Sequence, residues 1–361
     1  MKNIMKYMLV AITAISFSVA QAGELSVTGN AKASYTVASS DSTAGAVHAD
    51  QGLGVANEFT LSASGELDNG MTWNYAVDID GATVQDDSKL TLTTPIGTLG
   101  VFIHEGGLDV DNAASQSVIS RPSDTSFDEG MYDSWDISGN NTLQYHTPAD
   151  LLPFGIAFKV AHAPSRAAGA TNSYEAAGAT NAGTFTAPTA TAVTQTSATV
   201  GGRTANHYQV KANPIEGLNI GADYLEFNDV MGVEGGQAPE SGSYYLTYAI
   251  GPATIGYSKN FLATAFGADE TTDYIESIEG TKYSVAFNVN DDLSISYENE
   301  ESNPANRTNA TANYTIESSG LQVAYTMGGM TLGLAMNEHE NVAYTQNRDV
   351  KDTVFSVAMA F

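Results

Sequence analysis

The chain of 361 residues contains no cysteine, so neither disulfide bonds nor thiolate chemistry contributes to it. Basic residues are scarce: 14 Lys and Arg stand against 41 Asp and Glu, which gives a formal net charge of −27. Such a charge repels nucleic acid and attracts cations. An acidic disordered protein can be equally charged, but a hydrophobic fraction of 42% with 18 Tyr and 13 Phe is too high for disorder.

Long apolar runs are also missing. The longest begins the chain, where Lys2 and Lys6 precede the apolar segment 7–19 and the small residues Ala20-Gln21-Ala22. This order predicts a signal peptide over residues 1–22 and a mature chain of 23–361. A membrane helix needs about 20 apolar residues, so a helical membrane protein is excluded. A closed β-barrel also satisfies every backbone group in hydrocarbon, and a soluble secreted protein is the alternative.

The dominant pattern is an alternation with a period of two. Trp73 and Tyr75, for example, alternate with Asn74 and Ala76. Successive side chains of a strand point to opposite faces, so this pattern predicts strands with one apolar and one small or polar face. The same alternation is found along residues 71–80, 283–289, 321–327 and 355–361.

Short turns and long connections succeed one another along the chain. Short turns such as Asp68-Asn69-Gly70 and Gly328-Gly329 contain residues that favour tight hairpins. The long connections lie near residues 37–54, 81–88, 106–140, 164–204, 228–242, 262–280, 301–311 and 340–350. Eight long connections and seven short turns predict an all-β fold of 16 antiparallel strands. Short periplasmic turns and long extracellular loops are typical of transmembrane barrels in the bacterial outer membrane.

The lysines within these strands support a barrel. A Lys facing lipid at the membrane midplane costs about 2–4 kcal/mol, so strand lysines are expected in the polar phase. Five of them follow this rule: Lys32, Lys89, Lys159, Lys211 and Lys282. Lys259 and Glu226 share the apolar phase, but both come near a loop end, where a long side chain reaches the membrane interface.

The chain ends on Phe361 after apolar residues at every second position, and residues 24–30 (ELSVTGN) open the mature chain. With the pattern of strands and loops, these features resemble the general porins of Gram-negative bacteria. The stretch 89–148 is the most porin-like part, although it lacks the Pro-Glu-Phe-Gly-Gly signature of the enterobacterial members. The resemblance implies a homotrimer, with the second long loop (81–88) reaching toward a neighbour. It also implies that the barrel-assembly machinery reads Phe361.

In porins the third long loop folds into the barrel and narrows the pore, and residues 106–140 hold that place in the order of the chain. We expect the loop acids to face lysines of the barrel wall across the lumen. The candidate acids are Asp109, Asp111, Asp124, Asp128, Glu129, Asp133 and Asp136. The candidate basic residues are Lys32, Lys89, Lys159, Lys211, Lys282 and Arg121, the last being the loop's own cation.

The expected function is passive diffusion of small hydrophilic solutes and ions through a water-filled channel in the outer membrane, surrounded by lipid. Several carboxylates in a narrow pore outweigh a few lysines, which predicts a cation preference. No cofactor and no catalysis are expected, because no Gly-x-Ser-x-Gly elbow is present and His339-Glu340 lacks a second zinc-binding His. A substrate-specific channel and a structural or adhesive barrel are the alternatives. Calcium at Asp109-Val110-Asp111-Asn112 stays open.

Overall fold

The computed structural model describes most of the mature chain. The described residues are 25–40, 51–80, 83–124, 131–148, 150–164, 186–191, 194–199, 204–228, 236–264, 275–307 and 313–360. The predicted signal peptide (1–22), Asp128, Glu129 and Phe361 lie outside these residues. Among the described residues, no helix is long and apolar enough to cross a membrane.

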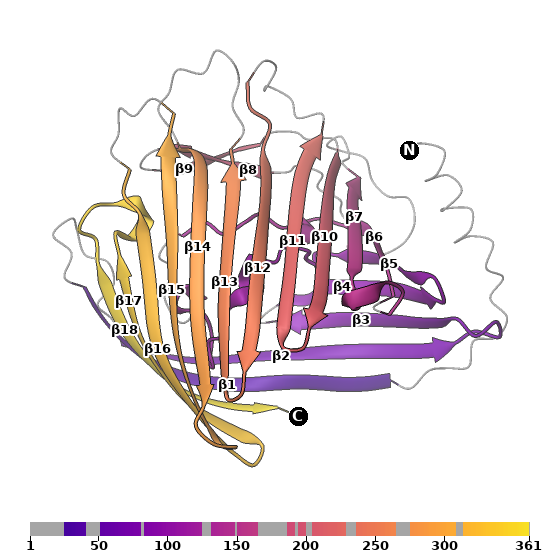
Figure 1. Ribbon diagram of the computed structural model, residues 1–361, viewed down its shortest axis with the longest axis horizontal. Coiled ribbons are helices and arrows are strands. Elements are labelled where there is room, and N and C mark those ends of the chain that lie inside the picture. Colours follow the sequence, from indigo (N-terminus) through magenta and orange to yellow (C-terminus); the bar gives the residue numbers. More distant parts are fainter. Residues whose placement is uncertain are drawn as a thin grey trace.

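Within the described part of the chain, 16 strands form one closed antiparallel barrel. Strands neighbour one another in chain order, β7 pairs with β10, and β1 pairs with β18 to close the barrel. Figure 1 shows β10 to β15 running side by side. The expected all-β barrel of 16 antiparallel strands is therefore confirmed.

The strands of the barrel have the following bounds: β1 (Leu25–Ser40), β2 (Gln51–Glu66), β3 (Thr72–Asp80), β4 (Thr83–Thr94), β5 (Gly97–Ile103), β6 (Thr142–His146), β7 (Ala157–Pro164), β10 (Thr204–Ile215), β11 (Leu218–Asn228), β12 (Glu240–Ile250), β13 (Ala253–Ala263), β14 (Ile275–Asn288), β15 (Leu293–Asn306), β16 (Ile316–Met327), β17 (Met330–Glu340) and β18 (Val350–Ala360). The segment between β7 and β10 contains a separate hairpin of β8 (Thr186–Thr191) and β9 (Thr194–Thr199).

The two faces of each strand differ as the alternation predicts. Along β12, Tyr244 and Leu246 are exposed, whereas Ser243 and Thr247 are buried. The exposed apolar residues form the outer face, where lipid replaces water, and the small or polar residues point into the barrel.

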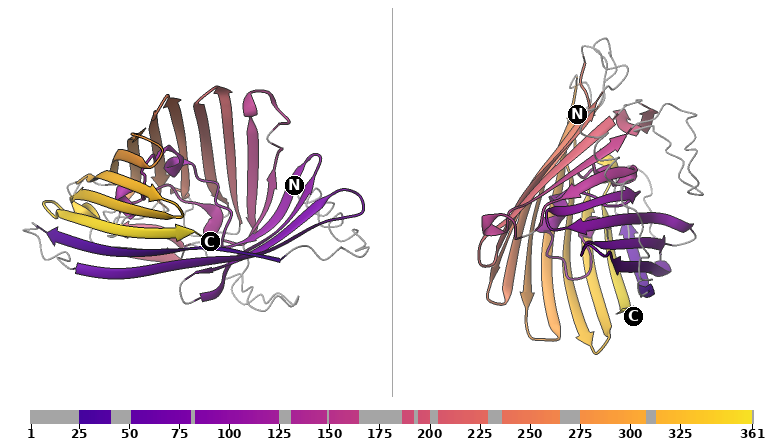
Figure 2. Two further views of the ribbon diagram at one scale, coloured as in Figure 1. Left: turned by 90° about the horizontal axis from the view of Figure 1, so that it is seen from below. Right: turned by 90° about the vertical axis from the view of Figure 1, so that its right-hand side faces the viewer.

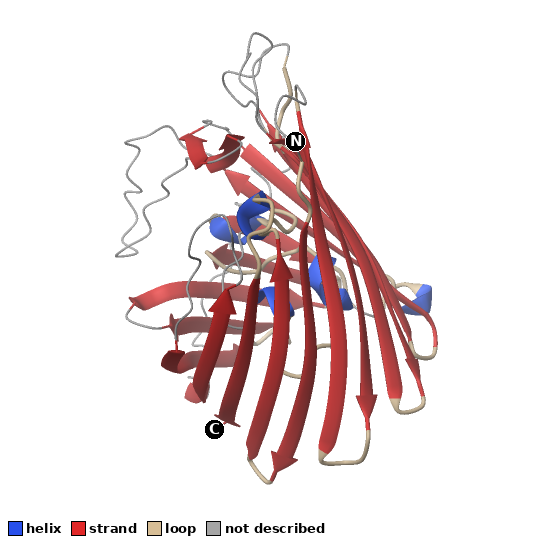
Figure 3. Cartoon of the chain, turned by 90° about the vertical axis from the view of Figure 1, so that its left-hand side faces the viewer, coloured by secondary structure: helices blue, strands red, loops and turns tan. Residues whose placement is uncertain are grey.

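Short hairpin turns gather at one end of the barrel (Figure 3). Gly217, Gly251 and Gly328 adopt positive φ values of 79°, 59° and 63° in three of these turns. Such turns match the twist of paired strands, and glycine adopts them without a steric penalty. We refer to this end as the short-turn end and to the other as the long-loop end.

One predicted connection is wrong. The sequence predicts a long loop over residues 81–88, but β4 begins at Thr83 and pairs with β3. A register shift after Asp78 lets Val84 pair with Ile79 and Asp87 pair with Asp78. The polar residues of this stretch suggest a loop, but a β-bulge accommodates them within the ladder.

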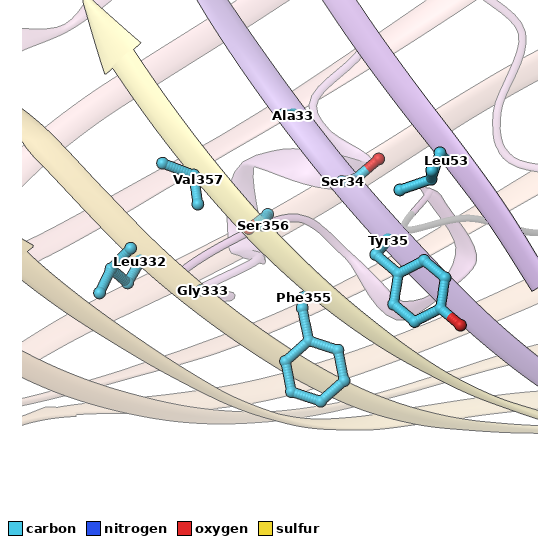
Figure 4. A pocket seen from close by; sticks show the side chains of 9 residues that line it. All are labelled: Ala33, Ser34, Tyr35, Leu53, Leu332, Gly333, Phe355, Ser356 and Val357. Carbon is cyan, nitrogen blue, oxygen red and sulfur yellow. The ribbon is translucent and has the colours of Figure 1, made fainter.

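The outer face carries a shallow apolar hollow of about 610 Å³ where β1 and β18 close the barrel (Figure 4). Tyr35 of β1 and Phe355 of β18 are register partners there. Leu53, Leu332 and Val357 also line the hollow, which belongs to the lipid-facing surface.

Candidate functional site: the internal loop and the lumen wall

The described residues of the third long loop, 106–124 and 131–140, which we call the internal loop, lie inside the barrel, as the left view of Figure 2 shows. The loop contains three short 3-10 helices, η1 (Asp111–Ala114), η2 (Pro122–Asp124) and η3 (Ile137–Gly139). Its backbone hydrogen bonds are made largely with inward side chains of the barrel. The predicted inward fold of the third loop is therefore confirmed.

Backbone N–H groups of the loop donate to one strand of the wall after another. Val110 N donates to Asp223 Oδ1 of β11 at 3.0 Å. Gln116 N donates to Ser284 Oγ of β14 at 3.1 Å, and Val118 N to Ser296 Oγ of β15 at 2.9 Å. The small polar side chains of the inner face thus take the place of backbone partners, which an irregular buried segment would otherwise lack.

Two glutamines of the wall hold the beginning of the loop. Gln144 Nε2 of β6 donates to Gly106 O, and Gln209 Nε2 of β10 donates to Leu108 O, both at 2.7 Å. At the far side, Ile119 N donates to Gln322 Oε1 of β16 at 3.0 Å. The loop therefore lies along the wall from β6 to β16.

Glycines of the wall make room for the loop. A Cβ at Gly256 would lie 1.8 Å from Ala114 O, and one at Gly333 would lie 2.9 Å from Ile119 Cδ1. A Cβ at Gly320 would likewise lie 2.9 Å from Pro122 Cγ. These close approaches explain glycines in the middle of strands, where they are otherwise unfavourable.

A buried ion cluster fixes the middle of the loop. Lys282 Nζ of β14 lies 2.6 Å from Asp133 Oδ1 and 3.1 Å from Asp111 Oδ2. Arg121 Nη1 lies 3.0 Å from Asp133 Oδ2 and 3.1 Å from Glu300 Oε1 of β15. Each carboxylate thus has a cation, as burial in low dielectric demands.

These contacts correct the predicted roles of Lys282 and Arg121. Both were expected to line the pore, but Lys282 is only 2% exposed and the Arg121 side chain 11% exposed. Arg121 also binds Asp124 within the loop at 2.7 Å. The two cations therefore form ion pairs with loop acids at the interface between loop and wall.

Ion pairing sets the protonation of Asp133. Burial opposes its ionisation, but Lys282 and Arg121 outweigh burial and lower the pKa of Asp133 to about 2. The same acids raise the pKa of Arg121 against the effect of its own burial. Both groups are charged at neutral pH.

A second cluster lies where the loop begins and ends. His207 of β10 lies between Asp136 of the loop, 3.4 Å from its Nδ1, and Asp223 of the wall, 3.0 Å from its Nε2. Burial and hydrogen bonds with Asp136 and Asp111 raise the pKa of Asp109 to about 10. Asp109 is therefore a neutral acid at pH 7, which its sequence position did not predict.

The other predicted lysines lie apart from the loop acids. Lys89 pairs with Glu105 at 3.2 Å, at the end of β5. Lys32, Lys159 and Lys211 are partly exposed on the inner face of β1, β7 and β10. Among the described residues, no ion pair joins these four lysines to an acid of the internal loop.

The wall opposite the loop presents partly exposed polar side chains. Ser34 of β1, Thr60 of β2, Asn74 of β3 and Thr91 of β4 all point inward and keep part of their surface accessible. Their neighbours in sequence, such as Leu90 at 54% exposure, point outward. Because these polar residues face the interior, their accessible surface lies within the barrel.

Two side-chain oxygens of the segment considered for calcium, those of Asp111 and Asn112, contact a lysine of the wall. Lys282 Nζ contacts Asp111 Oδ2 at 3.1 Å and Asn112 Oδ1 at 2.5 Å. In the part of the chain that the structure describes, no group of three or more His, Asp or Glu has the geometry of a metal site. Calcium stays a prediction.

A series of hydrogen bonds from Ser to His to Asp runs across β16 to β18. The sequence did not predict it. Ser318 Oγ lies 2.9 Å from His339 Nδ1, and His339 Nε2 lies 2.9 Å from Asp352 Oδ1. Only the register of three strands brings these residues together, so no local motif signals them. Ser318 and His339 are fully buried, which keeps a substrate away from the hydroxyl and favours a structural role.

Comparisons with known proteins show which solved structures have a similar fold. No family model and no curated protein matches the sequence. The chain is similar to a loop-deletion mutant of OmpT, an outer membrane protein of Vibrio cholerae, with a TM-score of 0.64, 11% identity and coverage of 94% of this chain and 100% of that one. An anion-selective porin from Comamonas acidovorans matches with a TM-score of 0.60, 13% identity and the same coverage. The fold is that of an outer-membrane porin.

The channel DcaP of Acinetobacter baumannii matches with a TM-score of 0.60 and 10% identity, over 94% of this chain and 97% of that one. At such identities the likeness concerns the fold alone. These neighbours are outer-membrane proteins, in agreement with the expected location and with the apolar outer face of the barrel.

Proposed function

We propose that the protein is a water-filled channel of the outer membrane for passive diffusion of small hydrophilic solutes. The observation that carries this proposal is the one-sided path of the internal loop. The loop hydrogen-bonds to the wall from β6 to β16 and leaves the inward polar side chains of β1 to β4 partly exposed. A barrel of about 16 strands is wide enough for an aqueous channel beside such a loop.

No bond is made or broken in this role. Solutes would pass between the internal loop and the wall of Ser34, Thr60, Asn74 and Thr91, whose hydroxyl and amide groups replace part of the water around a polar solute. The solved porins and channels that share the fold support the same role.

The cation preference expected from the sequence loses its main support. Asp111, Asp124 and Asp133 are paired with Lys282 or Arg121, and Asp109 is neutral at pH 7 because its pKa is about 10. With Glu300 of the wall, the three paired loop acids are carboxylates that share only Lys282 and Arg121, so part of their negative charge stays uncompensated. The loop acids therefore bring less negative charge to the lumen than the sequence suggests.

A homotrimer is part of the proposal. One of the solved relatives by fold is OmpT of Vibrio cholerae in a trimer form, with 11% identity and a TM-score of 0.59. The apolar outer face around Tyr35 and Phe355 is suited either to lipid or to another barrel.

Single-channel recording tests the proposed function. Purified protein added to a planar bilayer should give stepwise current increments of uniform size, together with uptake of small sugars into protein-loaded liposomes. A protein that inserts in the bilayer without conducting would refute the channel and favour a structural or adhesive barrel.

A further inference from the structure

Two lysines and a histidine gather on the inner wall close to the short-turn end. His146 of β6 and Lys159 of β7 are direct register partners on neighbouring strands. Lys159 is in turn opposite Gln209 of β10, and Lys211 is the next inward residue of β10. We call His146, Lys159 and Lys211 the basic row.

The basic row lies directly beside the beginning of the internal loop. Gln144 and Gln209, which bind the carbonyl groups of Gly106 and Leu108, each precede a member of the row by two residues. Two residues along a strand return to the same face, about 7 Å further along. Because β6 and β10 both run from these glutamines toward short turns, the row lies between the loop and the short-turn end.

The two lysines have no acidic partner among the described residues. Other inward cations do: Lys89 pairs with Glu105, and Lys282 pairs with Asp111 and Asp133. Lys159 and Lys211 are diagonal neighbours on paired strands, where long side chains still reach one another and like charges repel. Two adjacent unpaired lysines are therefore unexpected in a chain with 41 acids and 14 basic residues.

Tyr245 of β12 gives Lys211 a defined position. The Lys211 Nζ lies 5.9 Å from the centre of the Tyr245 ring, within the range of a cation–π contact. Gly221 of β11 is the register partner of both residues, and a Cβ there would lie 2.6 Å from Tyr245 Cε1. The glycine thus lets the ring reach across β11 to Lys211.

Tyr245 also packs against Val110 and Ala114 of the internal loop. The position of Lys211 is therefore coupled through one aromatic ring to the segment that narrows the lumen. The Lys211 and Lys159 side chains remain partly exposed, so a solute in the lumen can contact their ammonium groups.

We propose that Lys159 and Lys211, with His146 beside them, form a binding subsite for the anionic group of a permeating solute, such as a phosphate or a clustered carboxylate. The inference rests on the proposed channel function and names a solute class for it. A multivalent oxyanion relieves the repulsion between the two lysines, whereas a neutral solute does not. Charge at this subsite favours anions once they have entered the lumen.

Bilayer recordings with inorganic pyrophosphate as the probe test this subsite. Pyrophosphate added on the short-turn side should reduce the wild-type current at millimolar concentration. In the Lys159→Gln/Lys211→Gln double variant the concentration for half block should rise about fivefold or more, the scale expected for loss of two nearby charges. The chloride-to-potassium permeability ratio should fall in the same variant, and Lys159→Arg/Lys211→Arg should restore both properties.

A single variant serves as the matched control. Lys259→Gln removes an outward lysine from β13 and should keep the wild-type block. An unchanged block in the double variant, or an equal loss in Lys259→Gln, would overturn the subsite while leaving the channel intact. Absence of current in the wild type would overturn the channel itself and the subsite with it.

Discussion

Lys282 Nζ lies 2.6 Å from Asp133 Oδ1, although the two residues are 149 positions apart in the chain. This contact joins the internal loop to the wall of the barrel. Lys282 serves as a counter-ion of the loop, so Asp111 and Asp133, which the sequence assigns to the pore, are held in ion pairs at the loop–wall interface.

Replacing Lys282 by methionine should weaken the attachment of the loop. The change leaves the buried carboxylate of Asp111 without its cation. Loss of one partner of a buried pair costs about 3–5 kcal/mol. Urea unfolding in detergent should show a decrease of that order, and single-channel currents should become noisier. Lys259→Met, on the outer face, is the control, and equal stability of the two variants would contradict this role of Lys282.

Asp133 and Asp109 should respond in opposite ways to conversion to asparagine. The pKa of Asp133 is about 2 in the folded protein, below its pKa in the unfolded chain. Its ion pairs therefore stabilise the protein at pH values above the unfolded pKa, and this stabilisation is lost as the pH falls through about 2. Asp133→Asn should therefore lower stability at pH 7.

The pKa of Asp109 is about 10, above the unfolded value, so stability declines as the pH rises from about 4 to 10. Asn mimics the protonated acid. Asp109→Asn should therefore raise the free energy of unfolding at pH 7 relative to the wild type and flatten its decline between pH 5 and 8, as urea midpoints at both values will show. A loss of stability as large as that of Asp133→Asn would show that Asp109 is ionised.

Gly256 should not tolerate a larger residue. A Cβ at this position would lie 1.8 Å from Ala114 O, so Gly256→Ala must displace the internal loop or the strand. Overpacking of this kind costs about 1–3 kcal/mol, and the shift should change the single-channel conductance. Gly329→Ala has no heavy atom within 4 Å and should leave both properties unchanged. Wild-type behaviour of Gly256→Ala would mean that the loop does not touch β13.

The strands could be predicted from sequence because their signal is local. Alternation, as in Trp73 and Tyr75 against Asn74, fixes both the strand and its two faces. The bulge after Asp78 escaped prediction, because polar residues within a paired strand look like a loop. The inward orientation of the five strand lysines was predicted from the same alternation.

The partners of those lysines could not be predicted in this way. Periodicity predicts that Lys282 points inward but not where it lies along the barrel axis relative to Asp133. That position depends on the register of several strands and on the path of the loop. The Ser318–His339–Asp352 chain arises from register in the same way. Gly256 and Gly333, unusual within strands, were the available sign that the loop lies against β13 and β17.

The accessibility of Thr91 to a water-soluble reagent tests the central claim most directly. The chain has no cysteine, so Thr91→Cys and its outward neighbour Leu90→Cys each introduce a unique thiol. A charged thiol reagent added during a bilayer recording should reduce the conductance of Thr91→Cys and leave that of Leu90→Cys unchanged. An unreactive thiol at position 91, or equal effects at both positions, would contradict a water-filled lumen along β1 to β4.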